Sequence, residues 1–191
     1  MKKIKVMIGL AVMMLMVAAC SEDSTNDRGL TTVEQMFQQI KASYIGSYVS
    51  TNNVPKAIHI TIDKQANVVV DQFPLDLVFA KLYPDDYTAI SELEGALRLE
   101  APIKGFNLDA KFIEFSTNTD QTAPLEFTFK KNGVEHKGWA LVYVIGLYDQ
   151  QLIAMTMQLS VVDLVIDGED MRQQTPIHYF VDGAIKDTSD Q

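Results

Sequence analysis

Residues 125 to 145 read Leu-Glu-Phe-Thr-Phe-Lys-Lys-Asn-Gly-Val-Glu-His-Lys-Gly-Trp-Ala-Leu-Val-Tyr-Val-Ile, and this segment carries the clearest signal for a β fold. Asn132 and Gly133 stand at its centre. A type I′ turn needs a positive φ at both of its central residues, and the pair Asn-Gly tolerates that conformation best. The stretch therefore predicts a β-hairpin in which a two-residue turn joins strands 124–131 and 134–146.

The predicted turn also fixes which residues face each other across the hairpin. A two-residue loop places Lys130 opposite Glu135, which makes a pair of opposite charges. It places Phe127 opposite Gly138, whose bare backbone an aromatic ring can cover. The side chains on the two arms thus agree with antiparallel pairing in this register.

The second arm of the hairpin is apolar at both alternating sets of positions. One set contains Ala140, Val142 and Val144, and the other contains Trp139, Leu141, Tyr143 and Ile145. Such a strand is typical of the centre of a sheet that is covered on both faces. We therefore expect a central strand that the predicted helices cover. Trp139 should then be buried, which argues mildly against an aromatic platform for glycans.

Further strands are predicted from runs of alternating or β-branched apolar residues on both sides of the hairpin. They cover residues 44–49, 58–62, 68–70, 108–115, 153–166 and 177–185. Within the run 153–166 the apolar phase moves by one residue after Val161. A slip of this kind usually marks a β-bulge or a strand that changes sheets.

Helices are predicted at two places. Thr31 and Glu34 form a capping-box pattern, and the apolar residues that follow recur at helical spacing up to Ile40. Between Pro74 and Pro102 the apolar spacing again changes to three and four residues. This change predicts two short helices around residues 75–98, the first over 75–82 and the second over 90–97.

Together these elements predict one mainly β domain over residues 31–191, with an α+β arrangement left open. About eight antiparallel strands should form a barrel or a strongly curled sheet, with an N-terminal helix and two short inserted helices. Residues 44–48, Tyr-Ile-Gly-Ser-Tyr, follow the first helix. This start resembles calycin-like domains of small Bacteroidetes lipoproteins, which implies a barrel that can carry a small apolar ligand.

The N-terminus is typical of an export signal. Three lysines precede an apolar run from Val6 to Val17, and twelve residues are too few to cross a hydrocarbon core about 30 Å thick. Residues 17–20, Val-Ala-Ala-Cys, resemble the lipobox of bacterial lipoproteins. The resemblance implies removal of residues 1–19 and a diacylglyceryl group on Cys20. A plain secretory signal with a chance cysteine is the alternative.

Residues 20–30 are polar and predict a flexible tether between the lipid and the domain. Ser21, Glu22 and Asp23 resemble the acidic export signal of surface lipoproteins in Bacteroidetes. The resemblance implies display at the cell surface, with the periplasmic face of the outer membrane as the alternative. The membrane is then a partner through the covalent lipid.

The net charge of the chain limits the classes of partner that it can bind. Removing residues 1–19 takes away three of the sixteen basic residues and none of the twenty-five acidic ones, so the net charge falls from −9 to −12. A chain that is this acidic repels phosphate groups. Nucleic acid is therefore excluded as a partner, while a glycan, a peptide or a partner lipoprotein stays open.

The residues that carry chemistry form no recognisable constellation. His59, His136 and His178 lack the spacing of a zinc site, and the acids around Gly168 lack that of a calcium loop. Serines are many, but none stands in a Gly-x-Ser-x-Gly elbow. The sequence therefore selects no catalytic residue, metal site or cofactor.

Three classes of function remain open. The first, which we favour, is a noncatalytic binding module held at the membrane. The second is a calycin-like carrier whose barrel holds an apolar ligand, with Met155 and Met157 as possible lining residues of its cavity. The third is a hydrolase whose site is assembled from scattered residues. A filled or a hollow barrel would favour the first or the second, respectively.

Overall fold

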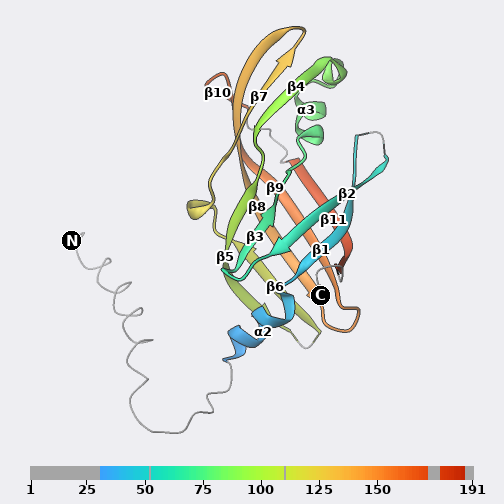
Figure 1. Cartoon of the computed structure of the whole chain (residues 1–191), viewed down its shortest axis with the longest axis vertical. Coiled ribbons are helices and arrows are strands. Elements are labelled where there is room, and N and C mark those ends of the chain that lie inside the picture. The colour runs from blue at the N-terminus through green and yellow to red at the C-terminus, as the bar shows by residue number, and fades with distance from the viewer. Residues whose placement is uncertain (1–30, 52, 110, 172–176, 188–191) are drawn as a thin grey trace, which may run out of the picture. The chain divides into compact units, whose positions relative to one another are not determined.

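Eight antiparallel strands close into a barrel in the computed structural model, which describes residues 31–51, 53–109, 111–171 and 177–187 (Figure 1). Around the barrel the strands are β1 (Ser43–Val49), β2 (Pro55–Ile62), β3 (Asn67–Val70), β5 (Leu99–Leu108), β6 (Phe112–Thr117), β8 (Val134–Asp149), β9 (Ala154–Ile166) and β11 (Ile177–Lys186). Pairing between β8 and β9 closes the circle. The prediction of a mainly β fold with about eight antiparallel strands is confirmed.

The chain divides into two units, Met1–Thr31 and Thr32–Gln191, and the barrel belongs to the second. The predicted signal peptide, the lipidation site Cys20 and the export residues Ser21, Glu22 and Asp23 lie outside the described residues. No helix within the described ranges is long and apolar enough to span a membrane.

The sheet continues beyond the barrel because β8 changes its partner along its length. Its second half pairs with β6, from Ile145 to Asp149. Its first half pairs with β7 (Leu125–Lys131), which in turn pairs with β4 (Ile90–Ala96). We call β4, β7, the first half of β8 and the adjoining end of β9 the extension; it occupies the upper end of the molecule in Figure 1.

The Asn-Gly hairpin forms as predicted. Asn132 and Gly133 have φ values of 52° and 79°, and Lys130 lies opposite Glu135. Phe127 lies opposite Gly138, and a Cβ at position 138 would stand 2.8 Å from the Phe127 ring. The aromatic ring therefore covers the glycine backbone, and the register follows from the turn and this contact together.

Strand β8 is covered on one face only, so the prediction of a strand covered on both faces is wrong. Ala140, Val142 and Val144 are buried in the core. On the other face Trp139 is 37% exposed, so the expectation that it is buried is also wrong. The apolar side chains between Trp139 and Leu147 on this face are half-buried, and no second layer formed by the described residues covers them.

The phase slip in β9 is a bulge, as predicted. Leu141 of β8 pairs with Asp163, but the next residue, Val142, pairs with Val161. Val162 is therefore the extra residue, and it is exposed. Because one residue is added, the buried face passes from odd to even positions along β9.

Two of the predicted helices are present. Helix α2 (Thr32–Ile40) buries Met36 and Ile40, and the Tyr44 hydroxyl donates a hydrogen bond of 2.6 Å to the Ile40 carbonyl oxygen. Helix α3 (Asp76–Leu82) buries Val78 and Phe79. Short 3₁₀ turns occur at η1 (Tyr87–Ala89) and η2 (Thr119–Gln121).

The second inserted helix, predicted over 90–97, is wrong because this segment forms strand β4. Ser91 pairs with Lys130 and Glu94 with Thr128, so β4 contains one residue more than its partner at this point. Glu92 takes a φ of 49° at this bulge. The extra residue brings side chains three positions apart to one face, which imitates the spacing of a helix.

Strand β5 was not predicted, and residues 108–115 do not form one strand. Leu108 ends β5 and Phe112 begins β6, and the Asp109 N–H donates a hydrogen bond of 3.0 Å to the Phe112 carbonyl oxygen. Pro102 lies inside β5, and proline is normally excluded from strand interiors. A register shift between Ile103 and Gly105 accompanies it. Strand β10 (Glu169–Asp170) is a short addition to the end of β9.

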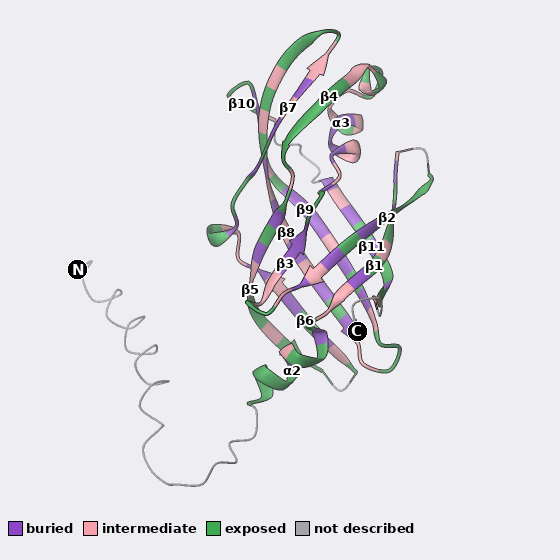
Figure 2. Cartoon of the chain, in the orientation of Figure 1, coloured by how far each residue is buried: buried purple, intermediate pink, exposed green. Residues whose placement is uncertain are grey.

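The barrel interior is packed with side chains. Buried and outward positions alternate along the barrel strands, as Figure 2 shows in purple and green. The rings of Phe73 and Tyr48 both meet the buried Tyr179 ring edge to face, with centroids 5.0 and 5.4 Å away. The Phe115 ring lies directly against the backbone of Gly146. An eight-stranded barrel can be filled by its own side chains or hold one small ligand, and here buried side chains fill it.

Candidate functional site

A surface groove of about 900 Å³ lies across the outer face of the extension. Its side chains come from four strands that pair in the order β4, β7, β8 and β9. The residues that give it chemical character are Glu126, Thr128, Glu135, Lys137, Trp139 and Val165. The volume lies in the range of pockets for small ligands, about 300–1,000 Å³.

Trp139 stands in the middle of the groove. It pairs with Glu126 of β7 on one side and with Val165 of β9 on the other. Two positions along β8, Lys137 pairs with Thr128. Because side chains alternate between the faces of a sheet, these residues all point away from the core. The groove therefore offers one indole surrounded by a carboxylate, an ammonium group and a hydroxyl.

Two glycines let the strands of the groove approach each other closely. Gly95 has a φ of 146°, and a Cβ there would stand 2.7 Å from the Phe127 Cα. A Cβ on Gly138 would stand 2.8 Å from the Val165 carbonyl oxygen as well as from the Phe127 ring. Since real Cβ atoms do not come this close, a side chain at either position would push the strands apart.

Asp167 closes one end of the groove in the turn between β9 and β10. Its two carboxylate oxygens bind the Lys137 backbone N–H at 2.9 Å and the His136 Nδ1 at 2.7 Å. The Lys137 hydrogen bond, helped by His136, lowers the pKa of Asp167. The His136 ring also stacks on Phe129, with centroids 5.1 Å apart. His136 and Asp167 thus hold the turn against β8.

The groove carries a negative balance of charge. Three carboxylates line it, from Glu126, Glu135 and Asp167, against the single ammonium group of Lys137. Together with the acidic chain, this balance disfavours phosphates and other anions as ligands. It leaves uncharged or basic ligands.

The two methionines proposed for an apolar cavity are core residues. Met155 is 0% and Met157 is 1% exposed, and both belong to the main cluster of buried side chains. Their neighbours across β11 are Ala184 and Val181. The methionines therefore help to fill the barrel interior.

The histidines do not converge. His59 is exposed on β2 and His136 lies in the extension, while His178 lies on β11. Among the described residues, no three His, Cys, Asp or Glu side chains are grouped closely enough to hold a metal ion. The acids around Gly168 form the β9–β10 turn, in which Asp167 and Gly168 have φ values of 53° and 83°.

A serine–histidine pair that sequence reasoning missed lies on the outer face of β9 and β11. Ser160 and His178 are cross-strand neighbours, and Ser160 Oγ lies 2.8 Å from His178 Nδ1. Gln158 Nε2 lies 3.0 Å from the same Ser160 Oγ and 3.1 Å from the same His178 Nδ1. A nucleophile–base pair also needs a group that orients the base. Among the residues that the structure describes, His178 contacts Ser160, Gln158 and Phe180. None of these is a carboxylate that could orient its ring.

No sequence motif could reveal this pair, because only the register of β9 against β11 brings it together. The same holds for the groove, whose four strands come from distant parts of the chain. The sequence does contain one signal for the groove, the apolar row of β8 that includes Trp139, but such a row predicts a buried face.

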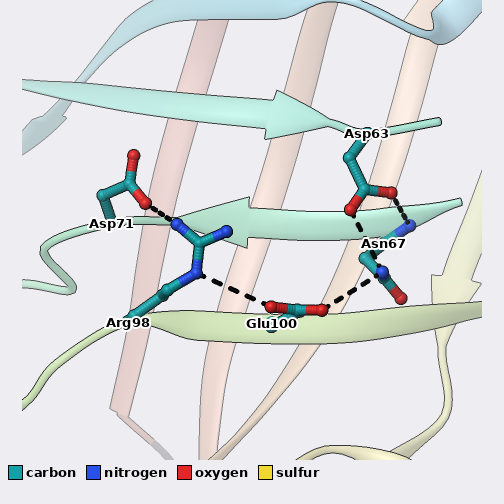
Figure 3. Close-up of polar contacts among 5 residues, drawn as sticks. All are labelled: Asp63, Asn67, Asp71, Arg98 and Glu100. Atoms are coloured by element: carbon teal, nitrogen blue, oxygen red, sulfur yellow. Dashed lines mark hydrogen bonds and ion pairs between the residues drawn. The ribbon is translucent and has the colours of Figure 1, made fainter. Parts of the chain in front are cut away.

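A second polar cluster lies on the outer face of β2, β3 and β5 (Figure 3). Asp63 accepts hydrogen bonds of 2.9 Å from the backbone N–H groups of Gln65 and Asn67. The Asn67 side chain bridges Asp63 and Glu100, at 3.1 and 3.4 Å. Arg98 pairs with Asp71 and lies 3.6 Å from Glu100. The cluster fixes the β2–β3 turn and its packing on β5.

Burial raises the pKa of the Asp63 carboxyl group, but the hydrogen bonds from Asn67 and Gln65 outweigh this effect. The pKa therefore lies below the usual 3.8. Carboxylate groups here are satisfied by the protein's own donors, so we assign the cluster to the stability of the turn.

Comparisons with protein-family models, with curated proteins and with solved structures found no match to this chain.

Proposed function

We propose that this protein is a lipoprotein anchored in the outer membrane through Cys20 and displayed at the cell surface. We propose further that it is a noncatalytic binding module and that the groove of the extension is its ligand site. The lipobox-like residues 17–20 and the acidic residues 21–23 support the address. The groove supports the binding role.

The observation that carries the binding role is the exposed indole of Trp139 in the groove. An indole is a flat, apolar surface with one polar edge, and it suits a ligand that has both apolar and hydrogen-bonding faces. A sugar ring is such a ligand. The carboxylates of Glu126 and Glu135 and the hydroxyl of Thr128 lie where they can bind its hydroxyl groups.

The charge of the groove favours an uncharged glycan, because anionic glycans would meet three carboxylates against one ammonium group. Because Trp139 is exposed, its indole is open to a sugar ring. The packed interior around Met155 and Met157 supports binding on the outside of the barrel over transport within it.

Trp139 is the only tryptophan of the chain, so its fluorescence reports on the groove directly. We would titrate a panel of uncharged oligosaccharides into the chain from residue 20 onward with Cys20→Ser, which retains the whole Thr32–Gln191 unit and its core. We expect a saturable shift in emission with at least one glycan. Emission that stays unchanged with every member, together with a shift for a basic peptide, would replace the glycan by a peptide as the ligand.

The matched variants are Trp139→Ala and Phe180→Ala, assayed by calorimetry with the same glycan. Phe180 is also an exposed aromatic residue, but it lies on β11 outside the groove. We expect Trp139→Ala to weaken binding by at least about tenfold, which corresponds to about 1.4 kcal/mol, and Phe180→Ala to leave it unchanged. Equal losses in both variants would contradict the assignment of the groove.

A further inference from the structure

The end of the barrel opposite the extension carries exposed aliphatic side chains on two neighbouring hairpin tips. Leu152 and Ile153 lie in the β8–β9 turn and are 75% and 56% exposed, and Leu108 at the end of β5 is 48% exposed. The backbone N–H of Gln150 donates a hydrogen bond of 3.0 Å to the Lys111 carbonyl oxygen, which joins the two tips. We call Leu108, Leu152 and Ile153 the apolar tip.

The β8–β9 turn is built to hold its apolar residues outward. The Asp149 carboxylate accepts hydrogen bonds from the backbone N–H groups of Gln151 and Leu152, at 2.8 and 3.0 Å. Ile153 has a φ of 55°, and it is the one β-branched residue with a positive φ in the described part of the chain. The left-handed region strongly disfavours such a side chain. The turn thus keeps an exposed and strained isoleucine where a glycine or an asparagine would fit without strain.

Helix α2 lies at the same end of the barrel, at the bottom of Figure 1, as does the β8–β9 turn. Lys186 Nζ at the end of β11 donates a hydrogen bond of 2.6 Å to the Gln39 carbonyl oxygen, and the Asp187 N–H donates one to Ser43 O. The first bond holds the helix against the end of β11, and the second joins this end of β11 to β1. The domain therefore begins beside the apolar tip.

The length of chain before α2 decides which end of the barrel can face the membrane. Twelve residue steps separate Cys20 from Thr32, and they reach at most about 43 Å when fully extended. Strand β8 has 16 residues and spans about 50 Å from the extension to the apolar tip. A lipid on Cys20 thus keeps the tip end within reach of its own bilayer.

We propose that the apolar tip inserts into the interface of the phospholipid bilayer that carries the Cys20 lipid. This proposal rests on the lipid anchor of the proposed function. Aliphatic side chains that project from two narrow tips suit the boundary between headgroups and acyl chains. A stable protein–protein interface covers about 800 Å² and about 20–30 residues on each partner, whereas the apolar tip has three residues. Docking would hold the groove at the far end of β8 away from the bilayer.

The experiment uses Cys20 as the only thiol of the chain. The chain from residue 20 onward would be coupled through this thiol to maleimide-bearing phosphatidylethanolamine in phosphatidylcholine vesicles, so that no cellular acylation is needed. A reporter is placed at the tip with Leu152→Trp in a Trp139→Phe background. Its matched control is Val134→Trp in the same background, because Val134 is exposed at the opposite end of β8.

We expect lipids with brominated acyl chains to quench the tryptophan at position 152 at least about fivefold more than the one at position 134. Adding Leu108→Ser and Ile153→Ser to the position-152 reporter should reduce the quenching, because two further apolar groups are lost. Equal quenching at both positions, or none at either, would overturn the proposal. Hydrogen exchange on the coupled chain with its native tip is the second measurement, and unchanged exchange at residues 150–153 would also overturn it.

Failure of this proposal can be separated from failure of the anchor. Mass spectrometry of the protein from its membrane tests acylation of Cys20, whatever the vesicles show. An acylated Cys20 with an unquenched tip would leave the proposed anchor standing and refute docking. An unmodified Cys20 with a quenched tip would refute the anchor and leave a lipid-binding surface.

Discussion

The two ends of strand β8 serve surfaces of opposite character. At its first residues, Glu135 and Lys137 flank Trp139 in a groove rich in charged and hydrogen-bonding groups. Beyond its last residue, Asp149, the turn presents the exposed side chains of Leu152 and Ile153. From Ala140 onward, the inward row of the strand belongs to the apolar core. The core therefore specifies the barrel, while the outward residues at each end specify what that end meets.

The extension and the apolar tip also use glycine and backbone conformation in opposite ways. The extension places glycines at Gly95 and Gly138, where strands come too close for a side chain. The tip does the reverse, because it places isoleucine where the backbone favours glycine. The first choice relieves strain and the second stores it. Stored strain at an exposed position points to a function for that residue.

The largest expected effect comes from disturbing the core that both ends share. Gly146→Val would drive a side chain into the Phe115 ring inside the barrel. We expect a loss of about 3 kcal/mol in the free energy of unfolding, because the packed interior cannot accommodate the added side chain without shifts of its neighbours. Urea unfolding measures it. Gly105→Ala is the control, since a Cβ there meets nothing within 4 Å. Equal stability of the two variants would show that the interior is not filled.

Gly95→Ala should separate the two ends. The new Cβ would meet the Phe127 backbone, and the φ of 146° would be strained. We expect a loss of about 2 kcal/mol confined to the pairing of β4 with β7. Hydrogen exchange should rise in β4 and β7 and remain slow in β6. The groove should then lose its ligand, while docking of the tip is unchanged. Exchange that rises to the same extent in β6 would contradict two independently built ends.

Ile153→Asn should stabilise the protein while it weakens docking. Asparagine tolerates a φ of 55° better than isoleucine does, and we expect a gain of about 1 kcal/mol in the free energy of unfolding. Thermal unfolding measures the gain. Leu152→Asn is the matched variant, because Leu152 has no positive φ, so it should lose docking without any gain. A lower melting temperature for Ile153→Asn would mean that the isoleucine is not strained.

The smallest expected effect concerns acid. Because the folded pKa of Asp63 lies below the unfolded value of 3.8, its hydrogen bonds contribute stability above pH 3.8. This contribution should disappear as the pH falls through the folded pKa. Asp63→Asn should therefore lower stability near neutral pH by less than about 1 kcal/mol and flatten the loss of stability below pH 3.8. Urea midpoints measured near neutral pH and below pH 3.8 test this prediction. If wild type and variant lose stability equally between the two pH values, Asp63 has no role in the acid dependence.

The features that sequence could predict are those that depend on neighbours in the chain. The Asn132–Gly133 turn determines its own register, and the pairing of Phe127 with Gly138 follows from it. The bulge at Val162 is visible because an apolar run changes phase at that point. Helix α2 follows from a capping pattern and a short apolar repeat. Each of these signals lies within one element or one turn.

The features that sequence reasoning missed depend on distant partners. The bulge at Glu92 gives β4 the apolar spacing of a helix, and only its pairing with β7 identifies it as a strand. Pro102 hides β5, whose pairing with β3 and β6 tolerates it. Trp139 is exposed because none of the described elements covers the outer face of the extension. An apolar row on one strand does not contain this information about tertiary structure. The groove and the Ser160–His178 pair arise from registers between separate strands.

The most direct test of the groove as a ligand site is acrylamide quenching of Trp139 in the vesicle-coupled chain, with and without the uncharged glycan that binds it. We predict that acrylamide quenches the free protein, that the glycan protects Trp139 from it, and that brominated lipids do not quench Trp139 in either case. If acrylamide quenches Trp139 equally with and without bound glycan, the ligand lies elsewhere, and the groove is not the ligand site.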